Sequence, residues 1–311
     1  METMTALRAH SRGGPEQLVY EQAPKPTPGP GEVLVRVHAV GITFAELGWD
    51  LTWTRKDGTD RTPIIPGHEV SGVVEQIGDD SRFAVGDEVY GLIDFDRDGA
   101  AAQYVCLPEA GLARKPRTVA HEQAAAMALS ALTAWQALTD HAALRAREKV
   151  LVTGGPGGVG VYAVQFARGC GAEVIATGGE RGRELVNRLG AAEYLDYTAG
   201  PLDQRVSGVD IVLDAAGAGD DESLYRVLRP GGRMILLAAP PDPERAKHHE
   251  AHATFFVVSP NAEQLGVLAD LVDNEQLEPI VSQTFPLAEG RDAYESGTRP
   301  RPPGKTVLVV H

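Results

Sequence analysis

Cysteine is scarce in this sequence, which contains only Cys106 and Cys170. Two cysteines cannot form a disulfide framework or a structural zinc site with four thiolate ligands. The sequence also has no hydrophobic run near the ~20 residues that span a bilayer, and residues 1–14 lack the apolar core of a secretory signal. We therefore expect a cytoplasmic protein with no membrane partner.

Positive charge is also in short supply, with 29 Lys and Arg against 43 Asp and Glu and a formal net charge of −14. Binding to nucleic acid depends on clustered basic side chains that displace counterions from phosphates. The only modest basic cluster contains Arg145, Arg147 and Lys149. We expect a small-molecule substrate and no nucleic-acid partner.

The chain of 311 residues is longer than one hydrophobic core usually serves, so two domains are expected. Up to about residue 112 it shows short β-rich runs between Gly and Pro, clearest at 33–37 and 70–74. From about residue 118 the pattern changes: an alanine-rich helical segment, 122–141, precedes apolar strands that alternate with amphipathic helices. The chain thus divides into a β-rich part and an α/β part.

The alternating segments predict a doubly wound parallel sheet, with one helix ending at Gly190 as its C-terminal cap. A last apolar run, 305–310, follows a proline-rich segment, and we place it back in the β-rich domain. The predicted domains are therefore 1–117 with 282–311, and 118–281. The predicted strands of the parallel sheet are 149–153, 173–177, 194–197, 209–214 and 232–237.

A glycine-rich turn lies between the first of these strands and the next helix, where residues 154–160 read Gly-Gly-Pro-Gly-Gly-Val-Gly. Glycine permits a tight turn and lets backbone N–H groups approach a pyrophosphate at the positive end of a helix. In this context the motif predicts a dinucleotide site. A glycine-rich turn that binds nothing is the alternative. The residues assigned to the site are Gly155, Gly157, Gly158, Val159 and Gly160.

The choice of cofactor depends on the end of the second strand, where an NAD enzyme usually places Asp or Glu. Here the sequence has Thr177-Gly178-Gly179, followed by Arg181 and Arg183 as candidate donors to a 2′-phosphate. NADPH is therefore the predicted cofactor, with Gly178 at its binding site. Two alternatives stay open: the arginines could form a solvated helix face, and Glu180 could bind the ribose as in an NAD site.

Further motifs flank the glycine turn in a fixed order over nearly the whole chain. They are Pro66-Gly-His-Glu-Val-Ser-Gly72, Val85-Gly-Asp-Glu-Val-Tyr-Gly91, Leu228-Arg-Pro-Gly-Gly232 and Gly304-Lys-Thr-Val-Leu308. This order resembles the medium-chain dehydrogenase/reductase superfamily, and within it the zinc-free quinone oxidoreductase and enoyl reductase branch. The resemblance implies a GroES-like catalytic domain, a Rossmann domain, nicotinamide in the cleft between them, and a homodimer.

Zinc-dependent members of this superfamily carry a cysteine ligand in a Gly-x-Cys segment, which here reads Gly41-Ile-Thr43. A second expected cysteine is replaced by Leu129 and Ser130. A catalytic zinc ion needs about three protein ligands, which His68 and Glu69 alone do not supply. We therefore expect no metal, with His68 hydrogen-bonded at the cleft and Glu69 as a structural or supporting carboxylate.

Without zinc, the simplest reaction is hydride transfer to a carbon conjugated with a carbonyl, because hydrogen-bond donors can stabilise the charge that develops on oxygen. The resemblance implies that Thr43 and Phe44 face the nicotinamide and that Thr133 touches its ribose or carboxamide end. Thr43 and Thr133 are thus candidate catalytic residues that act by positioning. The other candidate cofactor contacts are Tyr197, Leu237, Ala239, Phe256 and Lys305.

Candidate residues of the substrate pocket are Phe44, Trp49, Trp53 and His68, since aromatic rings could stack on a quinone or enone. The tryptophans could equally be packing or lid residues, and the threonines could satisfy backbone groups. Tyr90 and Tyr104 are candidate proton donors that the sequence does not distinguish from structural tyrosines. The histidine-rich stretch at 240–253 predicts a solvated loop or helix in preference to a metal site.

The sequence therefore predicts an NADPH-dependent oxidoreductase that reduces a quinone or an α,β-unsaturated carbonyl without zinc. Two alternatives stay open: a non-enzymatic NADPH-binding protein with a structural or regulatory role, and an NADPH-dependent carbonyl reductase of a natural-product pathway. Pocket shape, which these motifs do not specify, sets the substrate.

Overall fold

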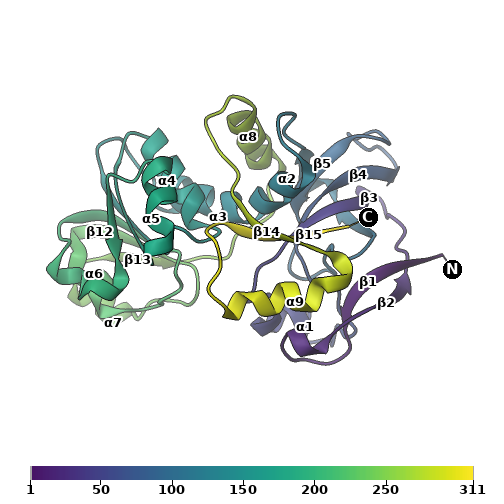
Figure 1. Cartoon of the computed structure of the whole chain (residues 1–311), viewed down its shortest axis with the longest axis horizontal. Helices are drawn as coiled ribbons and strands as arrows, with labels where there is room; N and C mark the ends of the chain where they lie inside the picture. Colours follow the sequence, from purple (N-terminus) through teal and green to yellow (C-terminus); the bar gives the residue numbers. More distant parts are fainter. Residues whose placement is uncertain (1, 311) are drawn as a thin grey trace.

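The computed structural model describes residues 2–310, which form two large sheets with helices packed around them (Figure 1). The chain starts with an antiparallel pair, β1 (Thr3–Ala9) and β2 (Leu18–Pro24). Two short helices, α1 (Asp50–Trp53) and α9 (Gly290–Glu295), lie near this pair (Figure 1). Alternating apolar residues of β1 and β3 enter one hydrophobic core, as a half-buried sheet requires.

A seven-stranded sheet forms most of the N-terminal part, in the order β14-β15-β3-β4-β5-β7 with β6 paired to β3. Two strands at one edge of this sheet, β14 and β15, come from the C-terminal end of the chain: β15 pairs antiparallel with β3 and parallel with β14. Residues 281–309 thus share one sheet with strands from residues 32–114, while the domain boundaries near residues 117 and 282 stay a prediction. The strands are β3 (Glu32–Gly41), β4 (Glu69–Ile77), β5 (Glu88–Leu92), β6 (Tyr104–Pro108), β7 (Leu112–Arg114), β14 (Val281–Pro286) and β15 (Lys305–Val309).

The second sheet is parallel throughout and has six strands in the order β10-β9-β8-β11-β12-β13. Numbered from its first strand, this is the order 3-2-1-4-5-6 of a doubly wound dinucleotide-binding sheet. The predicted parallel sheet is confirmed, and its strand order reverses between β8 and β11. The strands are β8 (Lys149–Thr153), β9 (Glu173–Gly178), β10 (Glu193–Asp196), β11 (Val209–Asp214), β12 (Leu228–Leu236) and β13 (His252–Phe255).

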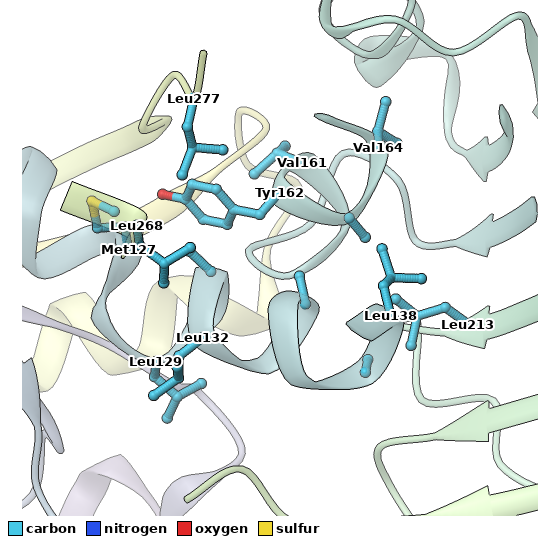
Figure 2. Packing of buried hydrophobic residues seen from close by; sticks show 14 of the residues in the cluster. Met127, Leu129, Leu132, Leu138, Val161, Tyr162, Val164, Leu213, Leu268 and Leu277 are labelled. Carbon is cyan, nitrogen blue, oxygen red and sulfur yellow. The ribbon is translucent and has the colours of Figure 1, made fainter. Parts of the chain in front are cut away.

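Four helices between residues 160 and 248 pack on the parallel sheet, whereas the alanine-rich helix His121–Ala128 packs on β3 and β4 of the seven-stranded sheet. In Figure 2, Tyr162 of α4 points among Met127, Leu268 and Leu277, which come from three separate segments. Gly190 ends α5 in the left-handed conformation with φ of 116°, as the sequence predicted. The helices are α2 (His121–Ala128), α3 (Ser130–Gln136), α4 (Gly160–Gly169), α5 (Arg183–Leu189), α6 (Glu222–Val227), α7 (Pro243–His248) and α8 (Ala262–Asp273). No helix within residues 2–310 is both long and apolar enough to cross a membrane.

Two predicted segments differ from the structure. The helix expected over 122–141 is divided into α2, α3 and a π-helical turn (Ala137–His141). The division falls where the Leu129 N–H leaves the helical ladder and donates to the buried carboxylate of Glu69, 3.0 Å away. The stretch 240–253 was wrongly expected to be only loop or helix, because His252 begins β13, which pairs along the free edge of β12.

Candidate active site

The glycine turn uses its glycines for two different purposes. At Gly160 a Cβ would overlap the carbonyl oxygen of Gly154, and at Gly155 it would lie 2.9 Å from Ala176 Cβ, so both positions require glycine for packing. At Gly157 a Cβ would have only Gly154 O nearby, at 3.0 Å. Gly157 therefore leaves its outer side open to a ligand, at the start of α4 where a helix attracts phosphate.

A cavity of about 1030 Å³ lies at the carboxyl ends of the central parallel strands. Its wall includes Thr153 and Gly157 on one side and residues 299–304 on the other. The Gly304 N–H donates to Pro156 O at 2.9 Å, which ties this second wall to the glycine turn. A site at the point where strand order reverses, with a volume of this size, suits a dinucleotide.

Of the two arginines predicted to bind the 2′-phosphate, only Arg181 lines the cavity. Arg183 lies outside the lining, since its guanidinium binds the Glu180 carboxylate at 2.8 Å and packs over the Tyr194 ring. Arg181 lines the cavity and has no ion-pair partner among residues 2–310. Gly178 and Tyr197 also line it, and Tyr197 is 70% exposed. Arg181 is therefore the freer candidate for the 2′-phosphate, and Glu180 is already engaged.

A buried polar cluster gathers around the ammonium of Lys305. Its Nζ donates to Thr43 Oγ1 at 3.0 Å and to Ser130 Oγ at 3.1 Å, and forms an ion pair with Glu69. Glu69 also accepts from the Leu129 N–H at 3.0 Å and, over a longer 3.3 Å, from the Thr43 hydroxyl. Burial raises the pKa of the Glu69 carboxyl, and the Lys305 ammonium opposes that rise. The cluster is thus a largely buried hydrogen-bonded network.

The cluster borders the glycine turn, because a Cβ on Gly158 would lie 3.3 Å from both Lys305 Cδ and Ser130 Oγ. Sequence reasoning placed Thr43 and Lys305 near the cofactor but gave Ser130 no role. The only sequence signal for Ser130 was its position, beside Leu129, where a cysteine was expected.

A second buried group contains His68 and Glu46. His68 Nδ1 lies 2.8 Å from Glu46 Oε2, which also accepts from the Gly67 N–H at 3.0 Å, and the Tyr294 hydroxyl donates to Glu46 Oε1. Within residues 2–310, His68 Nε2 is buried without a hydrogen-bond partner, and its ring lies beside Phe95. The carboxylate therefore orients the imidazole, and sequence reasoning missed Glu46.

The aromatic residues predicted for the substrate pocket divide into two groups. Phe44 lies under the Arg301 guanidinium, 4.5 Å away, and Trp49 packs edge-on against Phe95. Trp53 is 3% exposed in the hydrophobic core and donates its indole N–H to Leu47 O, so its assignment to the pocket is corrected to packing. Arg301 was missed by sequence reasoning, although it lines the cavity.

The remaining candidates have partners of their own. The Thr133 hydroxyl donates to Leu129 O at 2.8 Å, the backbone role that the sequence left open. Phe256 is buried with its ring against His141, while Leu237 and the exposed Ala239 follow β12. The two tyrosines considered as proton donors point elsewhere: Tyr90 is buried and donates to Leu265 O, and Tyr104 lies under the Lys25 ammonium.

Zinc does not fit the residues of this cleft. Throughout residues 2–310, no three His, Cys, Asp or Glu side chains are grouped as metal ligands. The atoms that converge beside Glu69 are two hydroxyls and an ammonium, and the ammonium repels a metal cation. The histidine-rich stretch offers no substitute, since His249 is bonded to Glu222 and stacked on Tyr225.

Comparisons with known proteins identify relatives of this chain over nearly its whole length. Residues 29–117 match the family model of the alcohol dehydrogenase GroES-like domain, which confirms the predicted GroES-like fold, and residues 189–308 match that of zinc-binding dehydrogenase. A probable zinc-binding oxidoreductase, mitochondrial, from Arthroderma benhamiae is 32% identical over 92% of each chain. The solved quinone oxidoreductase of Coxiella burnetii superimposes with a TM-score of 0.90 at 28% identity, covering 100% of both chains. A mycobacterial structure complexed with NADPH gives 0.87 at 28% identity, over 98% of this chain and 99% of that one.

Proposed function

The chain belongs to the medium-chain dehydrogenase/reductase superfamily, in its quinone oxidoreductase-like branch, and is an oxidoreductase; we propose that it transfers hydride from NADPH to a quinone or an α,β-unsaturated carbonyl without zinc. The observation that carries this proposal is the cavity at the strand-order reversal, with the Lys305 cluster beside its glycine turn.

The residues of the cavity fit the parts of the dinucleotide. The glycine turn and the first turn of α4 offer backbone N–H groups to the pyrophosphate. Arg181 and Tyr197 lie at the end where the adenosine 2′-phosphate is expected. Because Arg181 has no carboxylate partner among the described residues, its charge is free to favour NADPH over NADH. Support also comes from the mycobacterial neighbour whose structure holds NADPH.

The chain's own residues then prepare the substrate oxygen. When bound, the nicotinamide supplies the hydride. Thr43 lies in the cluster beside the glycine turn, and its hydroxyl can donate to an oxygen that gains negative charge as hydride reaches the conjugated carbon. Phe44, the next residue after Thr43, and Trp49 are the aromatic side chains that we assign to a flat substrate. A conjugated carbonyl fits this arrangement because hydrogen bonds suffice to stabilise its enolate.

The proposal is tested by following NADPH oxidation with a panel of quinones, enals, enones and enoyl thioesters, before and after dialysis against a strong chelator. We expect turnover on at least one conjugated substrate and an unchanged rate after chelation. Elemental analysis should find much less than one zinc ion per chain. Stoichiometric zinc whose removal abolishes activity would contradict the proposal.

The same panel separates the alternatives. A non-enzymatic role predicts tight NADPH binding with no turnover on any member. A carbonyl reductase of a natural-product pathway predicts reduction of unconjugated ketones at the carbonyl carbon, which product analysis distinguishes from reduction of the conjugated double bond.

A further inference from the structure

Lys305 carries a buried positive charge to the junction of the two sheets. It is the first residue of β15, and its side chain is 7% exposed. Its backbone N–H donates to Ile280 O at 2.9 Å, and the preceding Gly304 is bonded to Pro156 of the glycine turn. The start of β15 is thus fixed against both domains, which holds the side chain beside Gly158.

Three oxygen atoms from three different elements surround this ammonium. They belong to Thr43 after β3, Glu69 at the start of β4 and Ser130 at the start of α3. An ammonium has three N–H donors and no acceptor, so these partners use all of its hydrogen-bonding capacity. Glu69 is 1% exposed and balances the charge. The arrangement is that of a cation held by a set of oxygen ligands.

The superfamily resemblance implies that two of these oxygens come from segments where the zinc-dependent members have cysteine. Thr43 stands in place of the first cysteine, and Ser130, with Leu129, in place of the second. A metal ion bound by these two residues would need the lone pairs that now accept from Lys305. It would also lie within a few ångströms of a like charge in a buried place, where repulsion is strong. The ammonium and a metal ion therefore exclude each other.

We propose that the Lys305 ammonium is the resident cation of this cleft, standing where metal-dependent relatives hold a metal ion, and that it positions the Thr43 hydroxyl toward the substrate oxygen. This inference rests on the proposed reductase function only in its second part. Thr43 accepts from Lys305, so its own proton points away from the ammonium. Its present bond to Glu69 is long, at 3.3 Å, and Glu69 already has Lys305, so exchange for a substrate oxygen costs little.

The first part is tested by metal titration without any substrate. Thr43→Cys/Ser130→Cys, which keeps Lys305, is compared with the same pair of cysteines combined with Lys305→Met. Co²⁺ is titrated into each protein, and thiolate-to-metal absorption reports binding. We expect the variant without the ammonium to bind Co²⁺ at least about 100-fold more tightly, a difference of ~2.7 kcal/mol.

Circular dichroism is recorded in the same titration, so a triple variant that folds only when Co²⁺ is added counts as binding. Equal affinities in the two variants, or no binding by either, would overturn the proposal. Because the titration needs neither NADPH nor a substrate, its result stands even if the proposed reductase activity is absent.

The second part is tested by a double-mutant cycle on turnover. Lys305→Met is combined with Glu69→Gln, so that no unpaired charge is left buried, and the pair is made with and without Thr43→Ala. If Lys305 acts through Thr43, the double variant Lys305→Met/Glu69→Gln should have a kcat about 100-fold lower with little change in KM, as for loss of an oxyanion donor. Adding Thr43→Ala should then lower kcat by no more than about threefold.

Lys115→Met is the matched control, because Lys115 is also a buried lysine but donates to Pro116 O and Val119 O away from the cleft. Its kcat should equal that of the wild type. If the fold-losses of kcat from Thr43→Ala and from Lys305→Met/Glu69→Gln multiply in full, Lys305 acts independently of Thr43. That result would overturn the positioning role.

Discussion

Arg181 and Arg183 are separated by one residue but have different surroundings. Arg183 is held by Glu180 and Tyr194, whereas Arg181 faces the cofactor cavity. We predict that Arg181→Ala lowers NADPH affinity by about 10- to 150-fold, since a hydrogen bond to a charged group contributes ~1.5–3 kcal/mol. NADH affinity should hardly change, because NADH lacks the 2′-phosphate. Paired fluorescence titrations of the two cofactors measure the contrast.

Arg188→Ala is the control, because Arg188 is another exposed arginine of the same segment but pairs with Glu278 outside the cavity. It should leave both affinities unchanged. A wild-type protein that binds NADH as tightly as NADPH would contradict the assignment, and Glu180 would then become the candidate for holding the ribose.

His121 has a surrounding that disfavours its charged form. Burial lowers the pKa of its imidazole to about 4, nearby His38 and Lys115 act in the same direction, and Glu88 opposes them. His121 stacks on His38 at 4.4 Å, and its Nδ1 lies 2.8 Å from Ser71 Oγ. It is also the first residue of α2, where the helix dipole disfavours a positive charge.

The folded pKa of His121 lies below its ordinary value of 6.5, so the unfolded chain takes up this proton first as pH falls. We predict that His121 has no effect on the free energy of unfolding above pH 6.5. Between pH 6.5 and about 4 its burial in the neutral form should lower the free energy of unfolding progressively as pH falls. Urea midpoints of wild type and His121→Gln, measured at about pH 7.5 and pH 5, isolate the effect. The variant should lose less stability on acidification; parallel losses would contradict the prediction.

At the scale of elements, the glycine turn joins β8 to α4 through residues with different steric limits. Gly160 is packed against Gly154, whereas Gly157 has an open outer side. We predict that Gly157→Leu lowers the melting temperature less than Gly160→Val does, because its Cβ would lie 3.0 Å from Gly154 O and not overlap it, but that it lowers cofactor affinity by about 5- to 150-fold, the equivalent of 1–3 kcal/mol of overpacking. Gly160→Val should mainly lower the melting temperature of the cofactor-free protein.

Calorimetry without cofactor and cofactor titration of both variants provide the comparison. Equal loss of stability in the two variants would mean that Gly157 also has a packing role. Normal NADPH binding by Gly157→Leu would place the pyrophosphate away from this turn.

At the scale of the whole molecule, the six-stranded sheet ends in β13, whose outer edge is unpaired within residues 2–310. Val257, two residues beyond this strand, is 55% exposed. An open strand edge with an apolar neighbour favours pairing with a second chain, and the superfamily resemblance implies homodimers. We predict a dimer at micromolar concentration and a shift toward monomer in Val257→Lys, which places a charge beside this edge. Sedimentation velocity measures both; a monomeric wild type would contradict the prediction.

The two domains also share packing that sequence motifs do not describe. Tyr90 and Leu92 of β5 belong to the same hydrophobic core as Tyr162 of α4 and Leu268 of α8, so residues of the β-rich domain are part of the core of the other domain. The predicted boundary near residue 117 therefore separates two sheets more clearly than it separates two cores.

The sequence by itself determined the features that depend on near neighbours in the chain. The parallel strands, the cap at Gly190 and the glycine turn follow from local periodicity and from the backbone freedom of glycine. The absence of cysteine at Thr43 and Ser130 was also visible there.

Only the tertiary structure decided which side chains meet. Lys305 and Thr43 are 262 positions apart and touch because β15 returns to β3. Arg183 was an equal candidate with Arg181 until its bond to Glu180 was seen, and Trp53 resembled a pocket residue until its indole was found in the core. Backbone conformation is set mostly by local sterics, whereas the partner of a side chain is set by segments that fold against it from elsewhere in the chain.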